Sequence, residues 1–544
     1  MTRSGGDAVY EALRALGVDT VFGIVSVHNV PIFDAVARRG EIEIVTVRHE
    51  QSAAHAADGY ARATGKLGVA LASTGPGTTN TMTGLYEAAF ASSPVLLITG
   101  QVQTSKYGRS QAMLHEAEQQ LPMLQTVCRH VESPRTPDEV VPAIYRAAAD
   151  VLSGRPQPGA VEIPIDLQHG EVPSDDLEPL GARPTAVDDQ IDRAVDLMRS
   201  ASRRILWAGG GVIRSGGAAA LTRLAEELDA PVITTVNGRG SIPEDHRLCV
   251  GSITTEPNVR TLLAGAEVVC AIGTRFRWGD TANYSLPIEA QLIHIDADPG
   301  VFGRTYEPHV RVVGDARDAI EAIAAALGDA KGDPSFADTA VQAARSARES
   351  VRSQIGPDYE VIMDTMRVML PRDAPIVRDS TVPAYMWADR LLPLYEPGTA
   401  ISPTSAAIGP GLPLAVGAAA GTRKPTLVIH GDGGFMLHIG ELATAAQFDL
   451  PMKVCVFNDG GYGILRGIQR QRYEGREIGV DLTTPDFAAV AKAMHVPAET
   501  VRSAKEFGEA FSRALEANGP YLLDIEMDAL HPMTGMGGRR RSSV

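Results

Sequence analysis

The sequence predicts an α/β protein made of three doubly wound parallel-sheet domains. Two observations carry this prediction: short apolar runs alternate with helical stretches along most of the chain, and glycine-rich turns follow several of these runs. Strands that alternate with helices form βαβ units, in which helices cover both faces of a parallel sheet. A length of 544 residues allows three or four such domains, each with its own core.

The first α/β unit is predicted over residues 1–170. Its apolar runs are expected to form strands, and the stretch EQSAAHAADGYARATG is expected to form a helix between two of them. The runs are VFGIV, EIEIVTV, LGVALAS and PVLLITG. The segment EVPSDDLEPLGARPTAVDD that follows is rich in proline and aspartate, which is typical of a linker.

A central Rossmann-like unit is predicted over residues 188–328, a third unit over residues 355–530, and a tail over residues 531–544. The first and third units resemble each other, because a strand, a glycine turn, an alanine-rich helix and a second strand recur in both with nearly equal spacing. This predicts two copies of one fold on either side of a different domain. The alternative is that any two βαβ units look alike.

Charge and composition exclude several classes of protein. The chain has 50 basic and 66 acidic side chains, a net charge of −16, which argues against a nucleic-acid or membrane-surface binder. The four cysteines lie far apart, so neither a disulfide framework nor a zinc site is expected. The first residues lack the apolar core of a signal peptide, and no apolar run approaches the roughly 18 residues of a membrane span. We therefore expect a cytoplasmic protein with small-molecule partners.

Two glycine-rich turns carry the chemistry. Gly431, Asp432, Gly433 and Gly434 follow the apolar run TLVIH, and residues 458–461 (Asn-Asp-Gly-Gly) follow the next run. Glycines after a strand let backbone N–H groups approach a phosphate, and carboxylate oxygens suit Mg²⁺. The turns therefore predict a diphosphate and Mg²⁺ site at the strand ends, although two ordinary turns are the alternative.

The chain resembles the thiamine-diphosphate (ThDP) enzymes of the acetolactate synthase, benzoylformate decarboxylase and benzaldehyde lyase group. The resemblance covers almost the whole chain and includes the GDG turn and the stretches RHEQSAAHAADGYARATGKLGV, STGPGTTN, PVLLITGQV and GLPLAVGAA. It implies an N-terminal pyrimidine-binding domain, a central domain and a C-terminal diphosphate-binding domain. It also implies ThDP- and Mg²⁺-dependent decarboxylation or carboligation of a 2-oxo acid, through a C2 carbanion and an enamine.

The resemblance assigns the cofactor contacts residue by residue. The Mg²⁺ ligands would be Asp432, Asp459 and the carbonyl of Gly461; because the family usually has Asn at position 459, Asn458 is the alternative ligand. The carbonyl of Ala406 would accept the 4′-amino group of ThDP, and Ile408 would support the bent cofactor, although a core role for Ile408 remains the alternative. The further contacts would be Ser380, Thr381, Val382, Gly431, Gly433, Gly434, Tyr462, Gly463 and Ile464.

The same resemblance gives three catalytic residues. Glu50 would hydrogen-bond N1′ of the aminopyrimidine and so activate the cofactor; it is expected at the end of the strand EIEIVTV, partly buried, where desolvation favours its protonated form. His28 matches an active-site histidine of benzaldehyde lyase, and His115 stands in place of the glutamine of acetolactate synthases. Two imidazoles near the reacting carbon would suit proton transfer.

Several alternatives stay open. His28 favours an acyloin lyase or ligase resembling benzaldehyde lyase, and a simple 2-oxo acid decarboxylase also fits. The turn at residues 209–211 would suit a nicotinamide- or flavin-dependent oxidoreductase, and an inactive paralogue is the non-enzyme option. The Gly-Met-His-Gly loop of the FAD site in acetolactate synthases is replaced by GSITTEPNVR, which favours a central domain without FAD. In this family the cofactor lies between two chains, so we expect at least a homodimer and favour a homotetramer.

Overall fold

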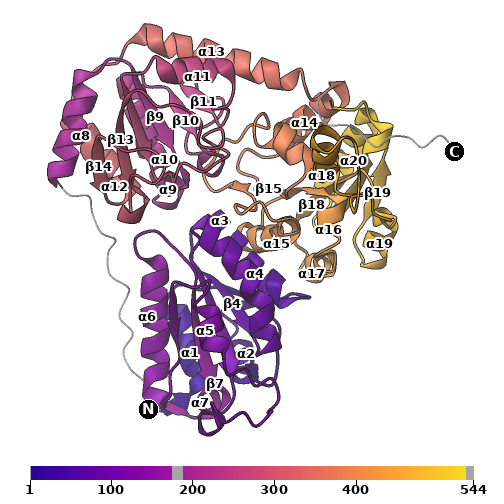
Figure 1. The fold of residues 1–544 in the computed structure, drawn as a ribbon. Coiled ribbons are helices and arrows are strands. Elements are labelled where there is room, and N and C mark those ends of the chain that lie inside the picture. The colour runs from indigo at the N-terminus through magenta and orange to yellow at the C-terminus, as the bar shows by residue number, and fades with distance from the viewer. Residues whose placement is uncertain (1, 174–187, 534–544) are drawn as a thin grey trace.

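The computed structural model describes residues 2–173 and 188–533 and contains three parallel six-stranded sheets, each flanked by helices (Figure 1). The predicted α/β class with three doubly wound sheets is confirmed. Of the predicted linker, only the ends are described: residues 171–173 pair as strand β8 (Glu171–Pro173) with β1 (Thr2–Ser4), and a helix begins at Asp188. Residues 534–544 of the predicted tail lie outside the described residues.

The N-terminal and C-terminal sheets have the same strand order, which confirms the predicted repeat. The N-terminal order is β3 (Glu43–Thr46), β2 (Thr20–Gly23), β4 (Gly68–Ala72), β5 (Val95–Gln101), β7 (Gly159–Pro164) and β6 (His130–Glu132). The C-terminal order is β16 (Ala400–Ile401), β15 (Ile376–Arg378), β17 (Thr426–Gly431), β18 (Met452–Asn458), β20 (Tyr521–Glu526) and β19 (Ala498–Val501). Numbered within each domain, both sheets run 2-1-3-4-6-5.

The central sheet is built differently. Its order is β11 (Cys249–Gly251), β10 (Val232–Thr234), β9 (Arg204–Ala208), β12 (Val268–Ile272), β13 (Gln291–Asp296) and β14 (Val310–Val313). Numbered within the domain this is 3-2-1-4-5-6, the order of dinucleotide-binding folds. The central sheet therefore has the strand order of a Rossmann-like fold.

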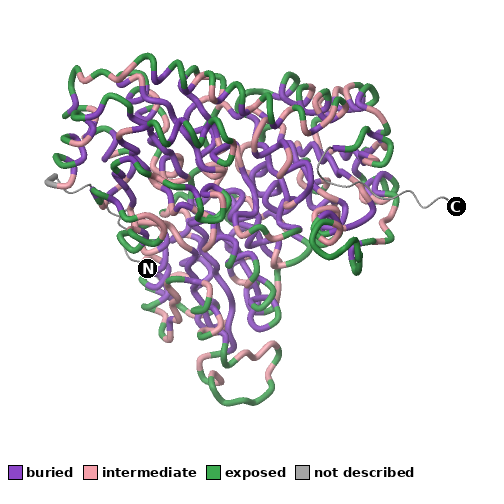
Figure 2. Tube along the Cα trace, turned by 45° about the horizontal axis from the view of Figure 1, so that its top comes forward, coloured by how far each residue is buried: buried purple, intermediate pink, exposed green. Residues whose placement is uncertain are grey.

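Helices surround the sheets, and the strands form the buried interior (Figure 2). The N-terminal helices are α1 (Gly5–Ala15), α2 (Val30–Arg39), α3 (Glu50–Thr64), α4 (Pro76–Ala91), α5 (Gln120–Leu124), α6 (Val140–Leu152) and α7 (Ile165–His169). The central helices are α8 (Asp188–Ser200), α9 (Gly210–Arg214), α10 (Ala218–Leu228), α11 (Pro257–Ala264) and α12 (Ala316–Leu327), and the long α13 (Pro334–Arg352) leads to the C-terminal domain. The C-terminal helices are α14 (Pro357–Met369), α15 (Gly411–Thr422), α16 (Asp432–Phe435), α17 (Glu441–Gln447), α18 (Gly463–Arg472), α19 (Phe487–Ala493) and α20 (Ala504–Glu516). The four cysteines are buried and free, and none of the described helices is long and apolar enough to cross a bilayer.

Helices α3 and α15 join the two outer domains. One hydrophobic cluster extends from the N-terminal sheet through both helices into the C-terminal sheet. The helix backbones approach so closely that a Cβ added at Gly417 would lie 1.8 Å from the Ala56 carbonyl oxygen, and one at Gly59 would lie 2.0 Å from the Leu414 carbonyl oxygen. Only glycine fits at these two positions, because the atoms met are backbone atoms that cannot move alone.

Replacing Gly417 should therefore separate the two helices. We expect Gly417→Ala to lower the free energy of unfolding by about 1–3 kcal/mol or more, the usual effect of overpacking a buried contact, as measured by thermal or urea unfolding. Gly508→Ala on α20 is the matched control, because its new methyl group would come no closer than 4.0 Å to the Thr365 side chain. The control should be as stable as the wild type or slightly more stable, and equal stability of both variants would contradict the proposed helix contact.

Candidate functional site

The turns predicted to bind diphosphate lie together at one edge of the C-terminal sheet. Strands β17 and β18 pair in parallel, with Gly431 opposite Phe457, so the segments that follow them, residues 432–435 and 459–462, leave the sheet at the same edge. Strand β15 pairs in parallel with β17, and the turn at residues 379–382 therefore joins them there. The carboxyl edge of a parallel sheet is the usual place of ligand binding in open α/β folds.

Two buried carboxyl groups meet at this edge. Asp432 is only 1% exposed, and its Oδ2 atom has no hydrogen-bond partner among the described residues. Burial, together with the neighbouring charge of Asp459, raises the pKa of Asp432 to about 7. Burial also raises the pKa of Asp459. An unpaired oxygen beside a second carboxylate lacks a counter-charge, and the pair is chemically suited to a hard divalent cation.

Arg466 partly balances this negative charge and was missed by the sequence analysis. Its buried guanidinium group donates to the Asp459 carboxylate at 3.2 Å, to the carbonyl of Gly460 at 3.4 Å and to Asp481 at 3.0 Å. Asn458, the alternative metal ligand, is engaged elsewhere: its Oδ1 accepts from the N–H of Gly460 and its Nδ2 donates to Asp524. The turn thus leaves Asp459, and not Asn458, beside Asp432.

Side chains of the neighbouring turns lie close to the glycines of these turns. A Cβ at Gly463 would lie 1.9 Å from Oδ2 of Asp459, and one at Gly433 would lie 2.7 Å from the ring of Tyr462. A Cβ at Gly431 would lie 2.6 Å from Oγ1 of Thr381. Side chains therefore fill the space that the missing Cβ atoms leave, and the three turns pack directly against one another.

The loop that carries Ala406 and Ile408 is held at this edge by Asp379. The buried carboxylate of Asp379 accepts from the backbone N–H groups of Gly409 at 2.9 Å and Gly411 at 3.1 Å. Ile408 is 41% exposed, which contradicts the alternative that it is a core residue of this chain. Of the neighbouring predicted contacts, Val382 lies in the hydrophobic core and Ser380 accepts a hydrogen bond from the hydroxyl of Tyr385.

Glu50 lies at a helix start and not at a strand end, which corrects the sequence prediction. Strand β3 ends at Thr46, and the side chain of His49 caps the helix that begins with Glu50 by accepting from the N–H of Gln51. The carboxylate of Glu50 accepts from Nδ2 of Asn80 at 2.9 Å, and a Cβ at Gly77 would lie 3.4 Å from its Oε1. Glu50 therefore faces the turn that follows β4.

The two predicted histidines lie beside the same turn. The ring centroids of His28 and His115 are 5.5 Å apart, and Nδ1 of His115 is 3.3 Å from the hydroxyl of Ser73. Burial and the neighbouring His115 lower the pKa of His28, whose buried Nδ1 has no hydrogen-bond partner among the described residues. Glu50, His28 and His115 are thus gathered around residues 73–77 at the carboxyl edge of the N-terminal sheet.

A buried polar network fixes this turn, and it was not predicted from the sequence. Oε1 of Gln120 accepts from the N–H of Gly75 at 2.9 Å and from the hydroxyl of Thr74 at 2.9 Å. Nε2 of Gln120 donates to the fully buried Glu162 at 3.1 Å. The network joins residues far apart in the sequence, so no local pattern identifies it.

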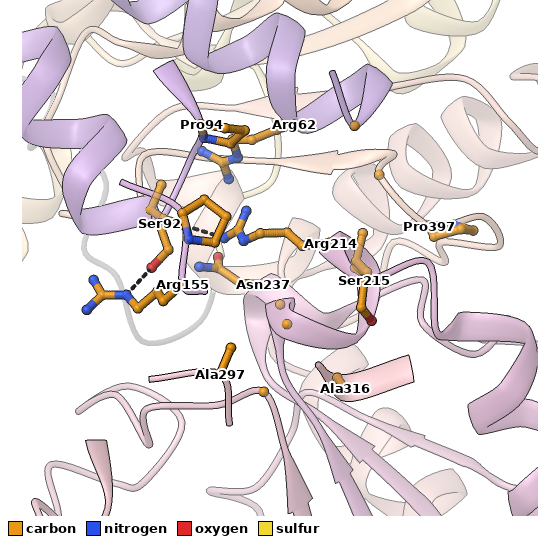
Figure 3. Close-up of a pocket in the computed structure, with 18 of the residues that line it drawn as sticks. Arg62, Ser92, Pro94, Arg155, Arg214, Ser215, Asn237, Ala297, Ala316 and Pro397 are labelled. Atoms are coloured by element: carbon orange, nitrogen blue, oxygen red, sulfur yellow. Dashed lines mark hydrogen bonds between the residues drawn. The ribbon is translucent and has the colours of Figure 1, made fainter. Parts of the chain in front are cut away.

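A separate cavity of about 430 Å³ lies where the three domains meet (Figure 3). Five arginines line it: Arg62, Arg155, Arg214, Arg275 and Arg277. Arg155 donates to the hydroxyl of Ser92 at 2.7 Å, and burial lowers the pKa values of Arg214 and Arg275 to about 10. The glycine turn of the central domain contributes Gly210 and Gly211 to the lining. Asp280, Asp296 and Asp315 also line the cavity, so its arginines outnumber its carboxyl groups by two.

Comparisons with known proteins identify the family of the chain. Three models of the thiamine pyrophosphate enzymes match the chain: the N-terminal TPP binding domain at residues 3–123, the central domain at residues 191–323 and the C-terminal TPP binding domain at residues 383–525. Thiamine pyrophosphate is another name for ThDP. The chain belongs to the thiamine pyrophosphate enzyme family.

Within that family the chain is similar to acetolactate synthases. It is 33% identical to a probable acetolactate synthase large subunit of Methanocaldococcus jannaschii, over 99% of this chain and 95% of that protein. It is 31% identical to the acetolactate synthase large subunit of Corynebacterium glutamicum, over 98% of this chain and 89% of that protein. It is also 33% identical to a probable 2-ketoarginine decarboxylase of Pseudomonas aeruginosa, over 90% of this chain and 88% of that protein.

Removing the charge of Asp432 should stabilise the protein free of metal. We expect Asp432→Asn to raise its free energy of unfolding by about 1–3 kcal/mol at pH 8, because the variant no longer buries an unpaired negative charge. The folded-state pKa lies above the ordinary value of 3.8, at about 7. The wild type therefore bears the full penalty above pH 7, and the difference between the two proteins should shrink as the pH falls towards 3.8.

Thermal unfolding with and without Mg²⁺ checks the same variant. The wild type should gain stability from Mg²⁺ and ThDP added together, whereas Asp432→Asn should gain almost none. Asp373→Asn serves as the control, since this exposed carboxylate pairs with Lys424 at the surface and should change neither result. A variant less stable than the wild type at pH 8 would contradict the electrostatic argument.

Proposed function

We propose that this chain is a ThDP- and Mg²⁺-dependent enzyme that removes CO₂ from a 2-oxo acid. The acyl group that remains is then either protonated or bonded to the carbonyl carbon of a second compound. The observation that carries the proposal is the buried pair Asp432 and Asp459, with the unpaired Oδ2, in glycine turns at the carboxyl edge of a sheet. Membership of the thiamine pyrophosphate enzymes supports it. Names of relatives include both a synthase and a decarboxylase, so both outcomes belong to the proposal.

The chain's own residues have separate roles in this proposal. Asp432, Asp459 and the carbonyl of Gly461 would hold Mg²⁺, with the diphosphate bound against the glycine turns. When bound, ThDP would supply a carbon nucleophile for the substrate carbonyl and a cationic thiazolium ring that takes up the electron pair released when CO₂ leaves. Glu50 would hold a proton at N1′ of the aminopyrimidine, which the Ala406 carbonyl and Ile408 would orient. The turns 379–382 and 431–434, and Tyr462, Gly463 and Ile464, would line the diphosphate.

His28 and His115 would transfer protons to and from the substrate oxygen. The lowered pKa of His28 keeps its imidazole neutral at neutral pH, so that it is able to accept a proton. Their close pairing also favours the second candidate, an acyloin lyase or ligase, because cleavage of an acyloin requires a base at its hydroxyl group. Neither candidate includes FAD, in keeping with the expectation from the sequence.

Glu50→Gln tests the assignment. We expect turnover to fall at least about 100-fold, because the amide is unable to exchange a proton with N1′, while affinity for ThDP and Mg²⁺ stays within about tenfold. The assay follows CO₂ release and products from pyruvate and benzoylformate, and cleavage of benzoin. Benzoin cleavage without CO₂ release would favour the acyloin lyase. Glu43→Gln is the control, since this exposed carboxylate pairs with Arg423 on the surface; unimpaired turnover of Glu50→Gln would refute the role of Glu50.

We further propose that the complete site forms between two chains, in a homodimer or a homotetramer. Large apolar side chains are exposed near both halves of the site: Val25, Val27 and Leu114 near the histidines, and Leu437 and Leu465 beside the carboxylate turns. Several large apolar side chains exposed near the same site support a protein interface there. A second copy would cover these side chains and bring Glu50 of one chain to Asp432 of the other.

Mixing two inactive variants distinguishes a shared site from a site within one chain. In a mixed dimer of Glu50→Gln and Asp432→Asn chains, a shared arrangement leaves one site with both residues intact. The mixed dimer, purified through two different tags, should thus have about half of wild-type activity. Each variant alone is the control. No recovery in a confirmed mixed dimer would contradict the shared site.

A further inference from the structure

The segment from Ser402 to Ala407 connects β16 to α15 and ends beside the proposed cofactor site. Thr404 is buried, whereas Ala406 is exposed, so the segment has an anchored base and an exposed tip. The tip carries the carbonyl that we assign to the 4′-amino group of ThDP, and the inference below therefore rests on the proposed function.

The anchor comes from another domain. Glu87 on α4 of the N-terminal domain is buried, and its carboxylate accepts from the N–H of Thr404, from the N–H of Ser405 at 3.1 Å and from the hydroxyl of Ser405. A buried carboxylate is held in place by such donors, because leaving any of them without a partner is costly. One side chain thus makes three hydrogen bonds to two consecutive residues.

The hydroxyl of Ser405 passes this constraint to the next peptide unit. Its oxygen also accepts from the N–H of Ala407 at 3.4 Å. The N–H of Ala407 and the carbonyl of Ala406 belong to one planar trans peptide and point in opposite directions. Fixing the N–H of Ala407 therefore fixes the direction of the Ala406 carbonyl.

The backbone of Ala406 needs such support. Its φ angle is +65°, in the left-handed region that residues other than glycine rarely adopt. A conformation of this kind persists only where the surroundings determine it. Here Glu87 and Ser405 hold the chain before and after Ala406, and Asp379 holds it at Gly409.

We propose that Glu87 is a positioning residue for the cofactor. Through the hydroxyl of Ser405 it directs the Ala406 carbonyl towards the 4′-amino group of ThDP. Helix α4 of the N-terminal domain thereby takes part in a cofactor contact made by the C-terminal domain.

The test compares two ligands that differ in one group. Apoprotein is titrated by calorimetry, in the presence of Mg²⁺, with ThDP and with the ThDP analogue that lacks the 4′-amino group. We expect Glu87→Ala to weaken ThDP binding about tenfold, the loss of one well-placed hydrogen bond, and to change binding of the analogue less than about twofold. Glu87→Gln should lie between the wild type and Glu87→Ala, because its amide oxygen still accepts from one N–H.

A second variant tests the route through Ser405 and does not depend on whether Glu87→Ala folds. Ser405→Ala should also weaken binding of ThDP and not of the analogue. The double variant Glu87→Ala/Ser405→Ala should bind ThDP no more than about twofold more weakly than Glu87→Ala, because both residues act on the same peptide.

Glu244→Ala is the matched control. Glu244 is also a largely buried carboxylate between two domains, but among the described residues it binds Arg239 and the N–H of Leu394 and has no hydrogen bond to residues 402–407. It should keep wild-type affinity for both ligands. Equal weakening of both ligands by Glu87→Ala, or wild-type affinity for ThDP in that variant, would overturn the role of Glu87. A wild-type protein that binds no ThDP would instead refute the proposed function, and the inference with it.

Discussion

The close contact between α3 and α15 determines where both halves of the site lie. Gly59 and Gly417 let the two helix backbones touch, and this contact joins the cores of the outer domains. Helix α3 begins with Glu50, and α15 begins at Gly411, directly after the loop of Ala406 and Ile408. Because helices are stiff, fixing the pair also fixes the two loops at their N-termini. The relative position of these two loops within one chain therefore depends on the absence of two side-chain methyl groups.

The second constraint is that Asp432 and Asp459 are buried without a full counter-charge. Arg466 donates to Asp459, yet Oδ2 of Asp432 remains without a partner among the described residues. A protein selected for stability alone would favour a neutral residue at position 432. The buried pair Asp432 and Asp459 lowers the stability of the metal-free chain, and the same two carboxyl groups favour binding of a cation. The net charge of −16 has little influence here, because surface charges are screened over about 10 Å.

The sequence predicted local features well and distant contacts poorly. Apolar runs and glycine turns are local signals, and they identified the three sheets, the repeat of the outer domains and the turn at residues 431–434. The predicted position of Glu50 at a strand end was wrong because the apolar run EIEIVTV extends beyond the strand. The helix that begins at Glu50 instead depends on a cap made by the side chain of His49. Arg466 lies on a helix with the charge pattern of a solvated surface, so only its partners in the fold reveal that it is buried. Glu87 and Gln120 were also not predicted, because their partners lie far away in the sequence.

The segment 402–405 shows how the domains depend on one another. Besides Glu87, it is held by Arg62, which donates to the carbonyl of Ser402 at 2.9 Å, and by Arg277 of the central domain, which donates to the carbonyl of Thr404 at 2.8 Å. Both arginines also line the basic cavity. An anion in the cavity would therefore compete with this segment for the N–H donors of Arg62 and Arg277. Because Ala406 follows this segment, the side chain of Arg277 links the central domain to the proposed cofactor site through the backbone of the C-terminal domain.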